Sequence, residues 1–88
     1  MPPIGYIVQY SNEEDYTVYH GFAKLHRTFS DAMERAKDLY RGFLEVNDEH
    51  YDGPFKTHNP TKANCDTQGS VVVFESPAYI VWIDCVID

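Results

Sequence analysis

One segment, residues Phe29–Val46, constrains the fold of this chain more than any other because its pattern is that of an amphipathic helix. At helical spacing, its apolar side chains fall on one side and its charged side chains on the other. The apolar side comprises Phe29, Ala32, Met33, Ala36, Leu39, Tyr40, Phe43, Leu44 and Val46. Ser30 stands where an N-cap belongs, with Phe29 before it as a staple residue. So wide an apolar side must be buried, and we therefore predict a helix that packs against a sheet.

Strand patterns stand on both sides of this helix. Residues 4–10 and 16–22 alternate in character around a polar turn, which predicts a β-hairpin. Residues 71–74 and 79–87 form a second such pair around a tight turn. We therefore predict a single α+β domain over residues 1–88, in the order strand, strand, helix, long loop, strand, strand. In this fold, a four-stranded antiparallel sheet has the one helix packed on one face.

The long loop, residues 47–69, carries turn-forming and polar residues without a sustained period. A structureless loop of this length is uncommon in so small a domain. We expect it to be functional, to be mobile, or to contain a short element that its pattern does not reveal. It also supplies His50, His58 and Cys65, whose side chains are of the types that bind zinc.

Neither metal binding nor catalysis has a signature in this loop. The spacing of the two histidines and the cysteine matches no zinc motif. Cys65 and a histidine could act as nucleophile and base, but nothing in the sequence brings them together. No nucleotide-binding or hydrolase motif is present. We therefore expect a protein that is not an enzyme and has no metal or cofactor, with Cys85 as a small core residue.

The charge of the chain is acidic, since 7 Lys and Arg residues stand against 14 Asp and Glu residues, for a net charge of −7 at pH 7. Such a charge opposes binding to phosphate backbones and to anionic membranes. We expect neither direct nucleic-acid binding nor membrane binding, and a basic protein as the partner. The first residues lead into a strand pattern without the features of a signal peptide, and two cysteines are too few for a disulfide scaffold. These features lead us to expect an intracellular protein.

The final strand pattern carries apolar side chains on both of its faces. One face has Tyr79, Val81, Ile83, Cys85 and Ile87, and the other has Ile80, Trp82, Asp84, Val86 and Asp88. A single helix covers only one face of a sheet. The second face, to which Ile7 and Tyr19 also belong, is therefore either open to a partner or a second copy, or covered by the 47–69 loop.

Acidic and aromatic residues outside the helix form the predicted binding surface. Aromatic side chains are favoured anchors at interfaces, and an acidic surface can occupy a basic groove as phosphates would. The predicted partner-binding residues are Glu13, Glu14, Asp15, Tyr16, Asp48, Glu49, Tyr51, Asp52, Trp82 and Asp84. The competing interpretation is an acidic surface that serves solubility alone.

In size, charge and general character the chain resembles small phage-encoded inhibitors, such as anti-CRISPR and DNA-mimic proteins. The resemblance implies a non-enzymatic protein that blocks the basic surface of a nucleic-acid-binding enzyme or defence complex, in the cytoplasm of an infected host cell. It rests on no motif and assigns no residue a role. Two alternatives stay open: a small regulatory domain that binds a metal or small ligand under the 47–69 loop, and a structural subunit that forms a homodimer through the open sheet face.

Overall fold

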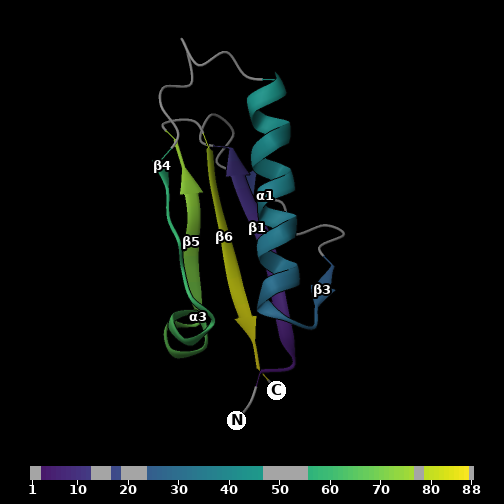
Figure 1. Cartoon of the computed structure of the whole chain (residues 1–88), viewed down its shortest axis with the longest axis vertical. Coiled ribbons are helices and arrows are strands. Elements are labelled where there is room, and N and C mark those ends of the chain that lie inside the picture. The colour runs from purple at the N-terminus through teal and green to yellow at the C-terminus, as the bar shows by residue number, and fades with distance from the viewer. Residues whose placement is uncertain (1–2, 13–16, 19–23, 47–55, 77–78, 88) are drawn as a thin grey trace.

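A computed structural model describes residues 3–12, 17–18, 24–46, 56–76 and 79–87. The described residues form an α+β fold with one antiparallel sheet and two helices (Figure 1). In chain order, the elements are β1 (Gly5–Asn12), β2 (Thr17–Val18), β3 (Leu25–His26), α1 (Phe29–Val46), β4 (Lys56–Thr57), α3 (Lys62–Gln68), β5 (Ser70–Glu75) and β6 (Tyr79–Val86).

Two long strands from opposite ends of the chain form the centre of the sheet. The order across the sheet is β2-β1-β6-β5-β4, and β3 also pairs with β1. β1 and β6 pair antiparallel along their whole lengths, from Gly5 opposite Val86 to Asn12 opposite Tyr79. The strands β2, β3 and β4 lie at the edges, and within the described residues they span 2 residues each.

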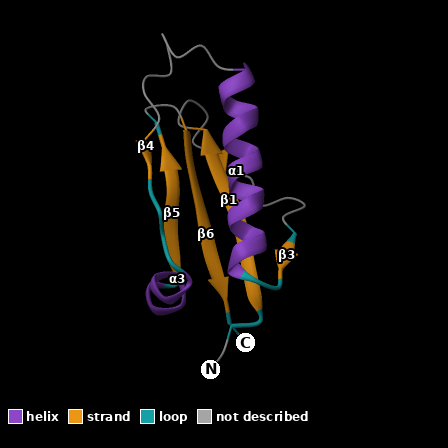
Figure 2. Cartoon of the chain, in the orientation of Figure 1, coloured by secondary structure: helices purple, strands orange, loops and turns teal. Residues whose placement is uncertain are grey.

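Both helices cover the same face of this sheet (Figure 2). α1 runs along β1 and β6, where the ring of Phe29 meets the ring of Tyr6 edge-on at 5.6 Å. Cys65 of α3 reaches the same face, because its thiol donates to the carbonyl of Ile83 at 3.6 Å. The buried core between the helices and the sheet comprises Tyr6, Val8, Phe29, Ala32, Ala36, Cys65, Val71, Val73, Phe74, Val81 and Ile83.

The helix α1 has the bounds that its periodicity predicts, but a different cap. The hydroxyl of Thr28 accepts a hydrogen bond from the backbone N–H of Asp31 at 3.1 Å, so the N-cap is Thr28 and the prediction of Ser30 was wrong. Phe29 accordingly begins the helix, and its side chain belongs to the core. Ala32 and Ala36 are completely buried, and their small side chains let the helix axis approach the sheet closely.

The prediction of four strands and one helix was wrong in number, although the α+β class and the antiparallel sheet are confirmed. The additional strand β3 lies between the predicted strand 16–22 and the helix, and it pairs Tyr6 with His26. This pairing brings β3 against Gly5, where a Cβ would lie 2.6 Å from the side chain of Leu25. Of the predicted strand 16–22, only Thr17 and Val18 lie within the described residues, paired with Ser11 and Asn12.

The predicted loop 47–69 contains β4 and the helix α3, which its sequence pattern did not reveal. α3 begins after Thr61, whose hydroxyl accepts from the N–H of Asn64 at 3.1 Å. It ends at Gly69, which has a φ of 88°. This left-handed conformation is one that glycine adopts without steric cost. Residues 47–55 lie outside the described part of the chain.

Candidate functional site

The face of the sheet opposite the helices presents half-buried apolar side chains. Along β6, Val81 and Ile83 are completely buried under the helices, whereas Ile80, Trp82 and Val86 point the other way and are partly exposed. On the neighbouring strands, Ile7 of β1 and Val72 of β5 share this second face. We call the set Ile7, Val72, Ile80, Trp82 and Val86 the open face.

Trp82 lies at the centre of the open face. It stands directly opposite Gln9 of β1 on one side and Val72 of β5 on the other. Neither described helix covers it, since both α1 and α3 pack on the other face of the sheet. Large aromatic side chains are enriched at the centres of protein interfaces.

A polar pair lies beside Trp82 and consists of Gln9 and Asp84. The side-chain amide of Gln9 donates through Nε2 to the carboxylate of Asp84. Gln9 is only 7% exposed, and its Oε1 atom is buried without a hydrogen-bond partner among the described residues. Because β1 and β6 contain no Lys or Arg, the centre of this face offers hydrogen-bond acceptors and negative charge. Its chemical complement is therefore a hydrogen-bond donor with a positive charge.

One edge of the same sheet carries a pair formed by a histidine and a carboxylate. His58, which follows β4, lies 3.0 Å from Glu75 of β5 through its Nε2 atom. Lys56 of β4 also stands opposite Glu75 in the strand register. The carboxylate of Glu75 therefore has His58 as a partner, whereas Asp84 forms no ion pair with any residue that the structure describes.

The structure places two of the ten predicted partner-binding residues. Trp82 and Asp84 lie two positions apart on β6 and share one face of the sheet, as their alternation predicts. The other eight lie outside the described residues: Glu13, Glu14, Asp15, Tyr16, Asp48, Glu49, Tyr51 and Asp52. Sequence reasoning gave Gln9 no role, because its pairing with Asp84 depends on the contact between two strands that are far apart in the chain.

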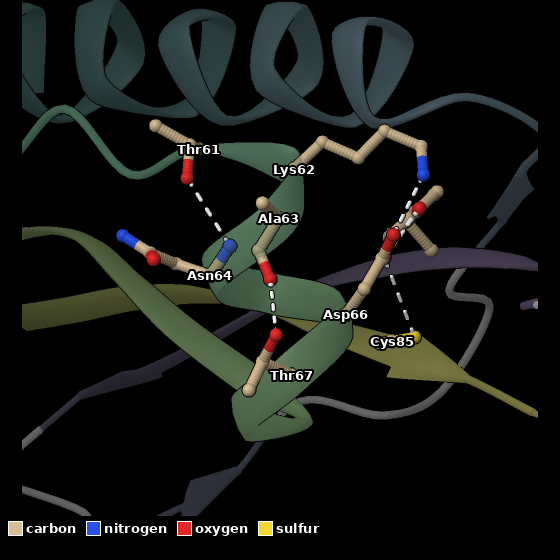
Figure 3. Close-up of polar contacts among 8 residues, drawn as sticks. Thr61, Lys62, Ala63, Asn64, Asp66, Thr67 and Cys85 are labelled. Atoms are coloured by element: carbon tan, nitrogen blue, oxygen red, sulfur yellow. Dashed lines mark hydrogen bonds and ion pairs between the residues drawn. The ribbon is translucent and has the colours of Figure 1, made fainter.

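A second polar cluster, which the sequence did not suggest, lies on the helix-bearing face around Asp66 of α3 (Figure 3). The hydroxyl of Tyr6 donates to Asp66 Oδ1 at 2.6 Å, and Lys62 Nζ donates to Asp66 Oδ2 at 2.6 Å. The Cys85 thiol lies 3.8 Å from the same Oδ1 atom. The hydrogen bonds from Lys62 and Tyr6 lower the pKa of Asp66, whereas burial, followed by the bond to Asp66, raises the pKa of Tyr6. The only local signal was the spacing of Lys62 and Asp66, which suits a helical ion pair.

The two cysteines are free thiols, and the environment of Cys65 does not favour nucleophilic chemistry. Cys65 is completely buried, and burial raises its pKa to about 11, so the thiol is protonated at neutral pH. His58 is engaged with Glu75 on β5. Within the described ranges, no three His, Cys, Asp or Glu side chains gather in a way that could hold a metal ion. His50, the third residue of the candidate zinc set, lies outside these ranges.

No protein family, curated protein or solved structure matches this chain. Neither helix in the described part of the chain is long and apolar enough to cross a membrane.

Proposed function

We propose that this protein is a non-enzymatic binding protein that docks a basic protein partner on the open face of its sheet. The observation that carries the proposal is the position of Trp82, a half-buried aromatic side chain at the centre of a sheet face that neither described helix covers. The neighbouring carboxylate of Asp84, which Gln9 holds through its side-chain amide, provides an acceptor for an arginine or lysine of the partner. An Arg side chain suits this site best, since its guanidinium can stack on the indole and donate to the carboxylate at once.

The net charge of −7 supports a basic partner, because it accelerates encounter with a positively charged surface. Proteins that bind nucleic acids present such surfaces to phosphates. A protein that occupies this kind of surface competes with the nucleic acid, and we therefore propose an inhibitory role of the anti-CRISPR or DNA-mimic kind. The apolar part of the open face would equally suit a second copy of the chain, and the test below distinguishes the two.

The first test needs no partner, because Trp82 is the only tryptophan of the chain. If Trp82 is accessible beside the Asp84 carboxylate, Cs⁺ should quench its fluorescence more strongly than iodide. Asp84→Asn should reduce this difference more than Asp38→Asn, which removes the same charge from the exposed side of α1. Equal effects of the two variants would show that only the net charge acts on the quenchers, and they would count against an acidic centre of the open face.

The second test measures binding to a partner purified from the native host, at two salt concentrations. Trp82→Ala should speed dissociation by a factor on the order of 30 or more, as expected for a central anchor worth at least about 2 kcal/mol. Asp84→Asn should weaken binding and flatten its salt dependence, whereas Asp38→Asn should bind like the parent. Binding of all three variants at parental strength would exclude the open face as the docking surface. A mass that doubles with concentration in the protein alone, and does not double in Trp82→Ala, would identify a second copy as the occupant.

A further inference from the structure

A cleft of about 670 Å³ lies on the helix-bearing face, away from the open face and between α1 and α3. Its apolar walls come from Pro3, Tyr6, Phe29 and Met33. The floor is firmly held, because Tyr6 is only 1% exposed, packs edge-on against Phe29 and is bonded to Asp66. The volume is in the range of small-molecule sites, whose walls are mostly apolar and aromatic.

The rim of the cleft is positively charged, although the protein as a whole is acidic. Arg27, Lys37 and Lys62 line it, and Glu34 is the one acidic residue among the lining residues that the structure describes. Lys37 lies 3.8 Å from Glu34, in a pair whose side chains are both more than half exposed. Such a pair contributes little and leaves the ammonium group available.

The other two cations differ in how far they are neutralised. Lys62 shares its charge with Asp66 at 2.6 Å, whereas Arg27 makes no ion pair within the described part of the chain. Among the described lining residues, Arg27 is therefore the cation whose charge no carboxylate neutralises, and it stands at the rim of an apolar cleft.

We propose that this cleft binds a small amphipathic anion, a molecule with an apolar body that ends in a single carboxylate. The apolar body would lie against Phe29 and Met33, and the thioether of Met33 can adapt to its shape. The carboxylate would be held at the rim by Arg27, whose planar guanidinium suits two parallel hydrogen bonds to a carboxylate. The inference is independent of the proposed partner surface, because the two sites lie on opposite faces of the sheet and share no residue.

The experiment titrates ¹⁵N-labelled protein with decanoate below its micelle concentration and follows the backbone amide shifts. Decanoate should bind saturably and shift the amides of Phe29, Ser30 and Met33. Decyltrimethylammonium has the same apolar chain with a positive charge, and it should not produce these shifts even though the net charge of the protein attracts it.

Substitutions test whether decanoate binds in the cleft. Two exposed arginines offer a matched comparison, because one lines the cleft and the other does not. Arg27→Gln should weaken decanoate binding at least about tenfold, because the variant loses the charge and the paired hydrogen bonds of the guanidinium. Arg27→Glu should abolish saturable binding. Arg41→Gln makes the same charge change on α1 outside the cleft and should bind like the parent.

Four results would overturn the proposal. They are the absence of saturable binding to the parent protein, equal affinities of Arg27→Gln and Arg41→Gln, the same amide shifts with the cationic detergent, and shifts confined to residues around Trp82. Trp82→Ala should leave decanoate binding intact. If the open face binds no partner, the expected decanoate binding is unchanged. If the cleft binds no decanoate, the proposal for the open face still stands.

Discussion

The carboxylate of Asp66 joins three segments of the chain that are far apart in sequence. One oxygen accepts from the hydroxyl of Tyr6 in β1 and lies near the Cys85 thiol in β6, and the other accepts from Lys62 in α3. The hydrogen bonds are short and the Tyr6 side of the cluster is buried. This carboxylate therefore fixes α3 to the centre of the sheet.

The pKa of Asp66 makes this link dependent on pH. Hydrogen bonds from Lys62 and Tyr6 hold the pKa of the folded carboxyl below its ordinary value of 3.8. In acid the unfolded chain therefore binds the proton more readily than the folded one. The stabilisation by Asp66 is present above about pH 4 and is lost as the pH falls through the folded pKa.

Asp66→Asn tests this link at the level of one side chain. We expect the variant to be less stable than the parent at pH 7 and the difference to shrink as the pH falls toward 3. Urea unfolding at a series of pH values measures both, with Asp38→Asn as the control for the loss of one exposed charge. A difference between Asp66→Asn and parent that stays constant over this range would show that the carboxylate is not stabilised in the folded state.

At the scale of elements, α3 depends on its two ends more than on its packing. It has 7 residues, of which only Cys65 is buried, so few side-chain contacts support it. Thr61 caps its start. At its end the N–H of Gly69 donates to the carbonyl of Cys65 at 2.8 Å, and the carbonyl of Gly69 accepts from the N–H of Cys85 at 2.8 Å. The left-handed residue thus both ends the helix and attaches it to β6.

Two glycine substitutions should change the free energy of unfolding in opposite directions. Gly69→Ala should lower the free energy of unfolding by about 1 kcal/mol, because alanine is strained at a φ of 88° although space is open around the position. Gly42→Ala, in the interior of α1 and also facing open space, should raise it by about 0.5–1 kcal/mol. Chemical denaturation of both variants gives the comparison. Stabilisation by both substitutions would mean that Gly69 does not hold a left-handed conformation.

The elements that the sequence predicted are those long enough to show a period. α1 repeats its apolar side over 18 residues, and β6 alternates over 8, so both the bounds of α1 and the shared face of Trp82 and Asp84 could be read directly. A single buried residue leaves no period in α3, and β3 is too short to alternate. The bond between Tyr6 and Asp66 joins residues 60 positions apart, and local pattern carries no information about it.

On the scale of the whole molecule, the sheet has a well-supported centre and short edges. β6 has β1 on one side and β5 on the other, and its inward side chains Val81 and Ile83 are completely buried. The strands β2 and β4 stand at the two ends of the strand order, and each pairs with a single neighbour among the described strands. Local opening should therefore begin at these edges, since fewer contacts oppose it there than at the centre.

Hydrogen exchange under native conditions should resolve this difference. We expect the amides of Val81 and Ile83 to exchange most slowly. Their free energy of opening should equal the free energy of global unfolding. The His58 amide, which donates to the carbonyl of Val73 at 2.7 Å beside β4, should exchange faster, by local opening. Equal protection of His58 and Ile83 would show instead that the edge opens only together with the centre.

The pairing of β1 with β6 also determines when the chain can fold during its synthesis. β1 leaves the ribosome early, but its longest partner, β6, is made more than sixty residues later. Until then β1 can pair with β2 and β3 alone among the described strands, and a hairpin without the rest of the sheet hardly repays the entropy of ordering it. A nascent chain released before residue 79 would therefore lack the middle of its sheet and expose Tyr6 and Val8 to proteases, so folding is expected to follow translation.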